Sequence, residues 1–329
     1  MKRRKSPRNK QRSSQRSVRP TAATKKTSPV APQHLESLPI TYQALIDYSM
    51  GQENFNPFEL RLEAILRIER LTGRPLICYV SQTNHLDPKV PARIDHDDLV
   101  GFGDMVQGVD GDAIDVLIVS NGGIPEAAER IVRLLRGKFE SVRFIVPAHA
   151  YSAATLICLS GNEILMDNLG TLGPIDPQIG GVPARTIIRA FENIEKRLRV
   201  EGPAALSAYL PLLKNYDLHT LEICKTAQDL SEELARTFLS RYMLNCPEQD
   251  PRVIKVVDDL SNFDKNKSHA RSIDRGTARE MGIIVNDIES IDGLQPLVRS
   301  LYNQYELFFD KTGFYKLYEN SRGINWGRQ

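Results

Sequence analysis

Apolar and polar residues along the central part of the chain form blocks that predict buried strands and amphipathic helices. Runs rich in Val and Ile predict strands at residues 114–119, 142–146 and 163–166. Apolar positions at helical spacing predict a helix between the first two strands, and a nearly all-apolar stretch at 152–160 predicts another before the third. Strands that alternate with helices favour parallel β-α-β units, so the sequence predicts an α/β fold.

The same patterns extend on both sides of this segment. Before it, the pattern predicts a helix at 57–72, a strand at 75–81 and a helix at 97–107. After it, helices are predicted at 183–200, 204–214, 218–246, 277–281 and 294–309, and a short strand at 283–285. The long helical signal at 218–246 is expected to be interrupted near Gln228 and Asp229, and Asp274 is expected to cap the helix that follows it.

Two strand-to-helix junctions carry residues suited to chemistry. A glycine pair, Gly122-Gly123, follows the first strand, and glycines permit positive φ and leave backbone N–H groups uncovered. Such groups at a helix start attract negative charge, as an oxyanion hole requires. Ser152 begins the apolar helix between small alanines that leave room for a substrate. Each junction also has a structural interpretation, a tight turn for the glycines and a helix N-cap for Ser152.

Four short motifs occur in one order along this region. They are Asn-Gly-Gly at 121–123, Tyr-Ser-Ala-Ala-Thr at 151–155, Gly-Asn-Glu-Ile at 161–164 and Leu-Gly-Pro-Ile-Asp-Pro-Gln at 172–178. This series resembles the ClpP/crotonase fold, its signal peptide peptidase A branch, and above all the serine dehydrogenase proteinase family. The resemblance extends from about residue 60 to residue 294. It implies a ClpP/crotonase-like β-α-β spiral core with a C-terminal helical arm.

The resemblance also implies roles for residues at both junctions. Ser152 would be the nucleophile, and the Gly122-Gly123 turn and Ala153 would form the oxyanion hole through the N–H groups of Gly123 and Ala153. The chain departs from the family pattern at two positions, with Asn121 where Pro is usual and Ala154 where Gly is usual. Neither change removes the hydroxyl or the backbone donors.

A serine nucleophile needs a base that takes its proton. By resemblance, Clp-type relatives use His and signal-peptide-peptidase relatives use Lys from further along the chain. Asp176 occupies the place of the Clp-type His, which disfavours a Clp-type triad there, and it would orient a partner or cap a turn. Lys225 is the first candidate base and Lys214 the second. His269 and His149 are rivals, because His needs no large pKa shift to act near neutrality.

Charged residues are distributed unevenly along the chain. Residues 1–30 hold eleven Lys or Arg and no acid, whereas the remainder holds 32 basic and 41 acidic residues, a balance of −9. The first 38 residues contain few large apolar side chains, so we expect a disordered basic arm. The arm could contact nucleic acid, an anionic membrane surface or the acidic body, or have no dedicated partner. The predicted organisation is this arm at 1–38, a peptidase domain at 39–294 and an aromatic-rich tail at 295–329.

The aromatic tail suggests docking, either on a neighbouring subunit of a homo-oligomer or on the chain's own body. Its aromatic residues are Tyr302, Tyr305, Phe308, Phe309, Phe314, Tyr315, Tyr318 and Trp326.

The sequence lacks the motifs that are typical of several classes of protein. No apolar run is long enough to span a bilayer, and the basic start has no apolar segment after it, which argues against a signal peptide. The four cysteines form no C-x-x-C pair and are expected to be reduced, so a cytoplasmic protein is the simplest expectation. There is no metal-ligand cluster of known spacing, no phosphate-binding loop and no dinucleotide fingerprint, so no cofactor is predicted.

The residues and the resemblance together predict a serine peptidase of the signal-peptide-peptidase-A-like or ClpP-like kind, which cleaves peptides or unfolded segments through an acyl-enzyme on Ser152. Two alternatives stay open. A crotonase-type acyl-CoA enzyme would also use two backbone N–H donors but would give Ser152 no required role. A non-catalytic oligomeric scaffold would keep the fold and use the basic arm or the aromatic tail.

Overall fold

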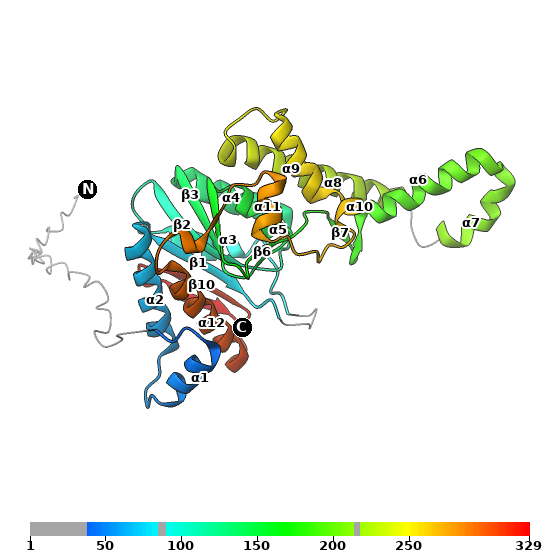
Figure 1. The fold of residues 1–329 in the computed structure, drawn as a ribbon. Helices are drawn as coiled ribbons and strands as arrows, with labels where there is room; N and C mark the ends of the chain where they lie inside the picture. Colours follow the sequence, from blue (N-terminus) through cyan, green and yellow to red (C-terminus); the bar gives the residue numbers. More distant parts are fainter. Residues whose placement is uncertain (1–37, 85–89, 214–217) are drawn as a thin grey trace, which may run out of the picture. The chain divides into compact units, whose positions relative to one another are not determined.

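Within residues 38–84, 90–213 and 218–329, which the computed structural model describes, a seven-stranded sheet forms the centre of the fold (Figure 1). The described residues all fall in one compact unit, Ala31–Gln329. The strands lie side by side in the order β11-β10-β1-β2-β3-β5-β9. The parallel strands are β1 (Leu76–Ser81), β2 (Ala113–Val119), β3 (Ser141–Val146), β5 (Glu163–Met166) and β9 (Val285–Asp287). The α/β fold with a mostly parallel sheet is therefore confirmed.

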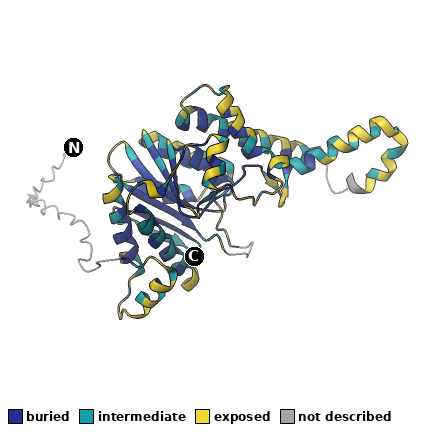
Figure 2. Ribbon diagram, in the orientation of Figure 1, coloured by how far each residue is buried: buried dark blue, intermediate teal, exposed yellow. Residues whose placement is uncertain are grey.

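Helices cover both faces of the sheet. One apolar cluster contains residues of α3 (Asp98–Val106), α4 (Pro125–Lys138), α5 (Ala153–Leu159), α8 (Leu218–Phe238) and α9 (Pro251–Ser261). The other contains residues of α1 (Tyr42–Met50), α2 (Pro57–Thr72) and α12 (Leu294–Lys311). Successive residues of β1 alternate between the clusters, Tyr79 joining the first and Cys78 the second. Burial on both faces explains why these strands read as continuous apolar runs (Figure 2).

The remaining elements surround this core. The short strands are β4 (His149–Ala150), β6 (Thr171–Leu172), β7 (Gln178–Ile179) and β8 (Val182–Pro183). The remaining helices and helical turns are α6 (Ala184–Glu201), η1 (Pro203–Ala205), α7 (Leu206–Leu213), η2 (Leu239–Met243), α10 (Phe263–Asn266), α11 (Arg275–Met281) and η3 (Ile288–Ser290). Two antiparallel strands end the described chain, β10 (Lys316–Asn320) and β11 (Asn325–Arg328). Residues 1–37 of the predicted basic arm and Lys214 lie outside the described residues.

Local signals placed several elements correctly. The helix predicted at 57–72 is α2, with the Asn56 side chain accepting from Phe58 N, Pro57 in the first turn and Gly73 ending the helix at φ 68°. The predicted cap is also present, because the Asp274 carboxylate accepts from Thr277 N at 2.8 Å and starts α11. These caps satisfy backbone donors that a helix end leaves without partners.

Two predicted boundaries were wrong. The short strand expected at 283–285 is β9, which begins at Val285, because Gly282 and Ile283 both donate backbone hydrogen bonds to Ala278 O and so still belong to the exit from α11. The helix expected to break near Gln228 continues through it, with Gln228 Nε2 donating to Glu232 Oε1 at 3.1 Å. It changes at Leu239 into a π-helical turn, η2.

The aromatic-rich segment packs within its own chain. Strand β10 pairs antiparallel with β1 inside the central sheet, and Tyr305 and Tyr318 are fully buried. Arg61 on α2 donates to Glu319 on β10 at 2.7 Å, and both side chains are buried. Tyr305 Oη donates to the same carboxylate at 2.8 Å. The last strands are thus tied to the sheet by backbone pairing and by a buried charge pair.

The four cysteines are free, and three of them, Cys78, Cys158 and Cys224, are buried. Burial raises the pKa of the Cys78 and Cys158 thiols, which keeps them protonated and unreactive. None of the described helices combines the length and the apolar composition that crossing a bilayer requires.

Removing Arg61 should destabilise the fold strongly. Arg61→Met would leave Glu319 as a buried charge without its partner, at a cost of about 3–5 kcal/mol in the free energy of unfolding, measured by urea denaturation. Adding Glu319→Gln should recover part of this loss, because no unpaired charge then remains. The control is Arg133→Ala, which breaks an exposed pair with Glu129 and should cost less than about 1 kcal/mol. Equal losses for Arg61→Met and Arg133→Ala would contradict the interpretation.

Candidate active site

The turn between β4 and α5 holds Ser152 in an unusual backbone conformation. Its φ and ψ are 53° and −117°, and among the described residues only Ser152, Asn245 and Lys267 have positive φ without being glycine. Such strained residues concentrate at functional sites, where the surrounding structure holds them in place. Ser152 occupies the N-cap position of α5, but its side chain makes no capping hydrogen bond. Its hydroxyl therefore does not serve the capping role that the sequence left open.

The Gly122-Gly123 turn lies directly against the Ser152 turn. Gly122 has φ 90°, and a Cβ there would lie 2.6 Å from Ser152 Cβ and 2.5 Å from Tyr151 O. A Cβ on Gly123 would lie 2.1 Å from Ile94 O. Real Cβ atoms do not approach other atoms so closely, so both positions require glycine for space, and Gly122 also for its conformation.

Two backbone amides remain available beside Ser152. Ile94 N donates to Gly122 O at 2.8 Å, and Ile124 N donates to Ile94 O at 2.9 Å. These bonds use the residues on either side of Gly123, and the Gly123 N–H itself has no acceptor among the described residues. Ala153 is the first residue of α5, so its N–H has no acceptor within the helix. Amides placed in this way can stabilise a negative oxygen formed at Ser152.

Asp176 and His269 form a hydrogen-bonded pair. Asp176 Oδ1 lies 3.0 Å from His269 Nδ1, and the carboxylate is buried while the imidazole is about three-quarters covered. An ionised carboxylate only accepts hydrogen bonds, so in a neutral imidazole this contact favours the tautomer with the proton on Nδ1 and with Nε2 free to accept. This is the tautomer that a histidine needs to take a proton from a hydroxyl.

One pocket unites these groups. It has a volume of about 650 Å³, and Gly123, Ser152 and His269 all line it. Its apolar wall includes Leu156 of α5 and Ile223 and Leu230 of α8. The arrangement can hold an apolar group next to a hydroxyl, an imidazole and two backbone donors.

Hydrogen bonds explain why the loop that carries Asp176 lies next to the loop that carries His269. Leu172 and Ile273 exchange hydrogen bonds, each from N to O at 2.9 Å, and this joins the loop after β6 to the loop before α11. The buried Thr155 hydroxyl donates to Ala150 O at 2.7 Å and accepts from Gly173 N at 3.1 Å. Thr155 thereby ties the loop of Asp176 to the start of α5.

Two other candidate bases, Lys225 and His149, lie outside this pocket. Lys225 lies on α8 with its side chain about half exposed, and its Nζ donates to Glu222 Oε1 at 3.0 Å. His149 on β4 has Nδ1 3.3 Å from Thr171 Oγ1 and packs beside the Tyr151 ring, and burial lowers its pKa. The residues lining the pocket of Ser152 include neither Lys225 nor His149.

Sequence reasoning did not find the wall that α8 supplies to the pocket. His219, Ile223, Thr226 and Leu230 line the pocket at spacings of three and four residues, which is one face of the helix. That periodicity was visible in the sequence, but it does not reveal which structure the face meets. In the described part of the chain, no group of three or more His, Cys, Asp or Glu side chains is placed to hold a metal ion.

A comparison with known protein families matches the segment that contains the Gly122-Gly123 turn and the Ser152 turn. Residues 105–201 match the family described as ClpP-like SDH-type serine proteinase. The matched range contains Gly122, Gly123, Ser152 and Asp176, and it ends before His269. The predicted resemblance to serine dehydrogenase proteinases is confirmed over this range.

Two curated relatives come from Methanocaldococcus jannaschii, and both are named as uncharacterised proteins. One is 43% identical over 80 residues, which is 24% of this chain and 28% of the relative. The other is 30% identical over 129 residues, which is 39% of this chain and 44% of the relative. The chain thus matches less than half the length of either relative.

Similar solved structures include a ClpP1 variant from Listeria monocytogenes, with a TM-score of 0.36 and 12% identity over 68% of this chain and 96% of that one. Another is a variant of the membrane-bound stomatin-specific protease 1510-N in complex with a substrate peptide. It has a TM-score of 0.34 and 18% identity over 59% of this chain and 71% of that one.

Gly123→Ala should disrupt the turn, because its Cβ would overlap the backbone of Ile94 and push that segment away from the amide. We expect a lower melting temperature and loss of reaction at Ser152 with a serine-directed probe. Gly137→Ala is the matched control, since a Cβ on Gly137 in α4 meets nothing within 4 Å. The control should leave reactivity unchanged and stabilise α4 by about 0.5–1 kcal/mol. Full reactivity in folded Gly123→Ala would refute the close-approach argument.

His149 should make the fold less stable in acid. Burial lowers its pKa below the ordinary 6.5, so as pH falls through 6.5 the unfolded chain binds a proton before the folded chain does. The free energy of unfolding contributed by this group therefore decreases towards lower pH. In His149→Asn, which does not titrate, the decrease between about pH 7 and pH 5 should be smaller. Urea denaturation across this range tests the point, and identical pH slopes for both proteins would contradict it.

Proposed function

We propose that this chain is a serine peptidase of the ClpP-like kind, with Ser152 as nucleophile and His269 as base. The observation that carries the proposal is that Ser152 and His269 line one pocket and that His269 is hydrogen-bonded to the buried Asp176. The sequence left Lys225, Lys214, His269 and His149 open as bases. The hydrogen bond from His269 to a buried carboxylate favours His269 among the described candidates, because the carboxylate selects the tautomer that can accept a proton.

The reaction follows from the placement of these groups. Ser152 Oγ attacks the carbonyl carbon of a peptide bond while His269 Nε2 takes the hydroxyl proton. The carbonyl oxygen becomes negative and accepts hydrogen bonds from Gly123 N–H and Ala153 N–H. His269 then gives the proton to the leaving amine, and the C–N bond breaks to leave an ester on Ser152.

Hydrolysis repeats these roles with water. His269 Nε2 takes a proton from water as its oxygen attacks the ester carbon. The proton returns to Ser152 Oγ when the acid product leaves. Asp176 stays ionised throughout, holding the imidazole in place and stabilising its charged form.

The substrate class is a peptide or an unfolded protein segment. The apolar wall of the pocket, which includes Leu156, Ile223 and Leu230, suits an apolar side chain next to the cleaved bond. Exposed apolar residues on the helical arm of α6 and α7 support self-association into a homo-oligomer. These are Val200, Leu206 and Leu210.

Labelling with a fluorophosphonate probe tests the proposal. Wild type should be labelled, and Ser152→Ala should not. His269→Ala should reduce the labelling rate by about 10²–10⁴-fold, as expected for removal of a general base. Asp176→Asn should reduce it as well, because the amide can donate to Nδ1 and favour the wrong tautomer.

Lys225→Ala is the matched control and should label within about twofold of wild type, since its ion pair is exposed. Sedimentation of the same sample measures self-association. Absence of labelling in a folded, assembled wild-type sample would overturn the proposal and favour the scaffold alternative. Loss of labelling in Lys225→Ala with retention in His269→Ala would overturn the choice of base.

A further inference from the structure

The loops that carry Asp176 and His269 are held together at a second point, the end of α9. The carbonyl oxygen of Leu260 accepts a hydrogen bond from Ile175 N at 3.0 Å, and Ile175 directly precedes Asp176. The same oxygen accepts from Asn266 Nδ2 at 3.3 Å, and Asn266 lies three residues before His269. One carbonyl group therefore contacts both loops.

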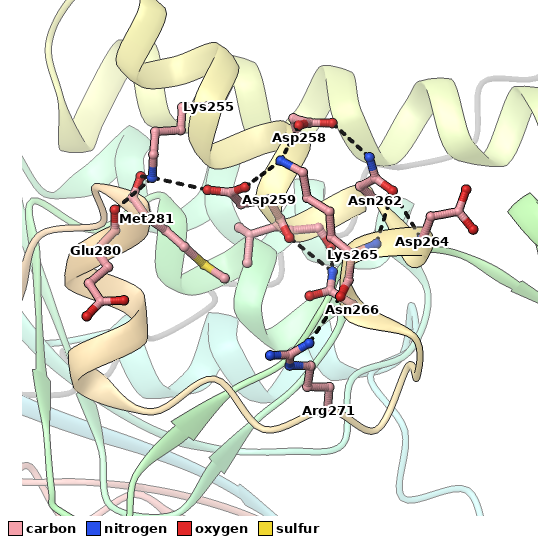
Figure 3. A network of polar contacts seen from close by, with 11 residues as sticks. Lys255, Asp258, Asp259, Asn262, Asp264, Lys265, Asn266, Arg271, Glu280 and Met281 are labelled. Carbon is pink, nitrogen blue, oxygen red and sulfur yellow. Dashed lines mark hydrogen bonds and ion pairs between the residues drawn. The ribbon is translucent and has the colours of Figure 1, made fainter.

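Asn266 is suited to this position by its side chain. The last carbonyls of a helix have no partners within the helix, and α9 ends at Ser261. Asn266 Nδ2 donates to Asp259 O at 3.0 Å as well as to Leu260 O, and the side chain is buried (Figure 3). An amide supplies two donors, so it can satisfy both carbonyls.

The segment between Asn266 and His269 has little freedom. Lys267 is in the left-handed region at φ 63° and ends α10. Arg271 Nη1 donates to Lys265 O at 3.0 Å and closes the loop across its base (Figure 3). Ile273 is held by its backbone pairing with Leu172. His269 thus lies on a short loop fixed at both ends.

A charged network surrounds the same helix ends, but it is more exposed. Lys265 Nζ bonds to Asp258 and Asp259 at 2.5 and 2.8 Å, and Lys255 Nζ bonds to Asp259 at 3.1 Å (Figure 3). The Lys265 side chain is half exposed, so solvent screens these pairs. The buried amide of Asn266 is therefore the stronger constraint on the loop.

We propose that Asn266 is a positioning residue for the His269–Asp176 pair, acting through the Leu260 carbonyl that it shares with the Asp176 loop. The inference rests on the proposed function, since it concerns the base of that reaction. Asn266 touches neither the nucleophile nor the reacting atoms. Its contribution is to keep the imidazole within hydrogen-bond distance of the carboxylate and directed at the pocket.

The test replaces the donor and keeps the shape. Asn266→Asp is nearly isosteric, but its carboxylate would face two carbonyl oxygens with no proton to donate. We expect the maximal rate of fluorophosphonate labelling to fall about 10- to 100-fold, because small displacements of a catalytic group have effects of that size. The probe concentration at half-maximal rate should change little, since the pocket wall is intact.

Lys265→Gln, the neighbouring residue on α10, is the control and should label within about twofold of wild type. Asn266→Gln keeps the amide donors and should retain more activity than Asn266→Asp. Circular dichroism and thermal melting establish that each variant is folded. If Asn266→Asp does not fold, Asn266→Ser, which lets water reach the carbonyls, takes its place with the same expectation.

Proton NMR supplies a readout that does not depend on activity. The Nδ1 proton between His269 and Asp176 should give a low-field signal in wild type and in Lys265→Gln. The signal should be lost in Asp176→Asn and lost or broadened in Asn266→Asp. If this pattern holds while wild type is not labelled, the proposed function fails and the positioning role stands. Labelling of folded Asn266→Asp at the wild-type rate, with the signal intact, would overturn the positioning role alone.

Discussion

The close approach of two turns is the constraint on which the rest of the site depends. The Gly122-Gly123 turn meets the Ser152 turn at Gly122, and the backbone of Ile94 lies against Gly123, so neither glycine has room for a Cβ. This packing places the glycine turn beside Ser152 and the start of α5. The parallel sheet makes the contact possible, because the chain leaves neighbouring strands at the same edge and enters α4 and α5 there.

Buried charge connects this edge to the end of the chain. Lys316 on β10 is fully buried, and its Nζ contacts Asp98 at 2.9 Å and Asp95 at 3.0 Å. Asp95 follows Ile94, whose backbone is hydrogen-bonded to the residues on either side of Gly123. A buried ion pair adds little stability compared with apolar residues of similar size in its place. Removing one partner is costly, however, because the other charge is then buried without a partner. The final hairpin is therefore part of the support for the glycine turn, although it is far from that turn in sequence.

Much of the fold could be predicted because its signals are local. The apolar runs of β2, β3 and β5 and the capped helix α2 are set by residues within a few positions of each element. The glycine pair and Ser152 stood out for the same reason, since each lies where a strand pattern gives way to a helix. The sequence did not show the features that depend on distant contacts. The strand β9 joins the sheet beside β5, where Ile164 N donates to Ile284 O, and β10 joins it beside β1 through antiparallel pairing of segments that lie far apart in the chain.

The sequence by itself determined the α/β class, the two junctions and the residues at them, because helix and strand periodicity and the need for glycine in a crowded turn are properties of short segments. Only the tertiary structure decided which base candidate meets Asp176. His269 lies 93 residues further along the chain, and no spacing rule relates the two. They meet because backbone hydrogen bonds at Leu172 and at Leu260 bring their loops together, and such contacts exist only after the sheet and its covering helices have packed.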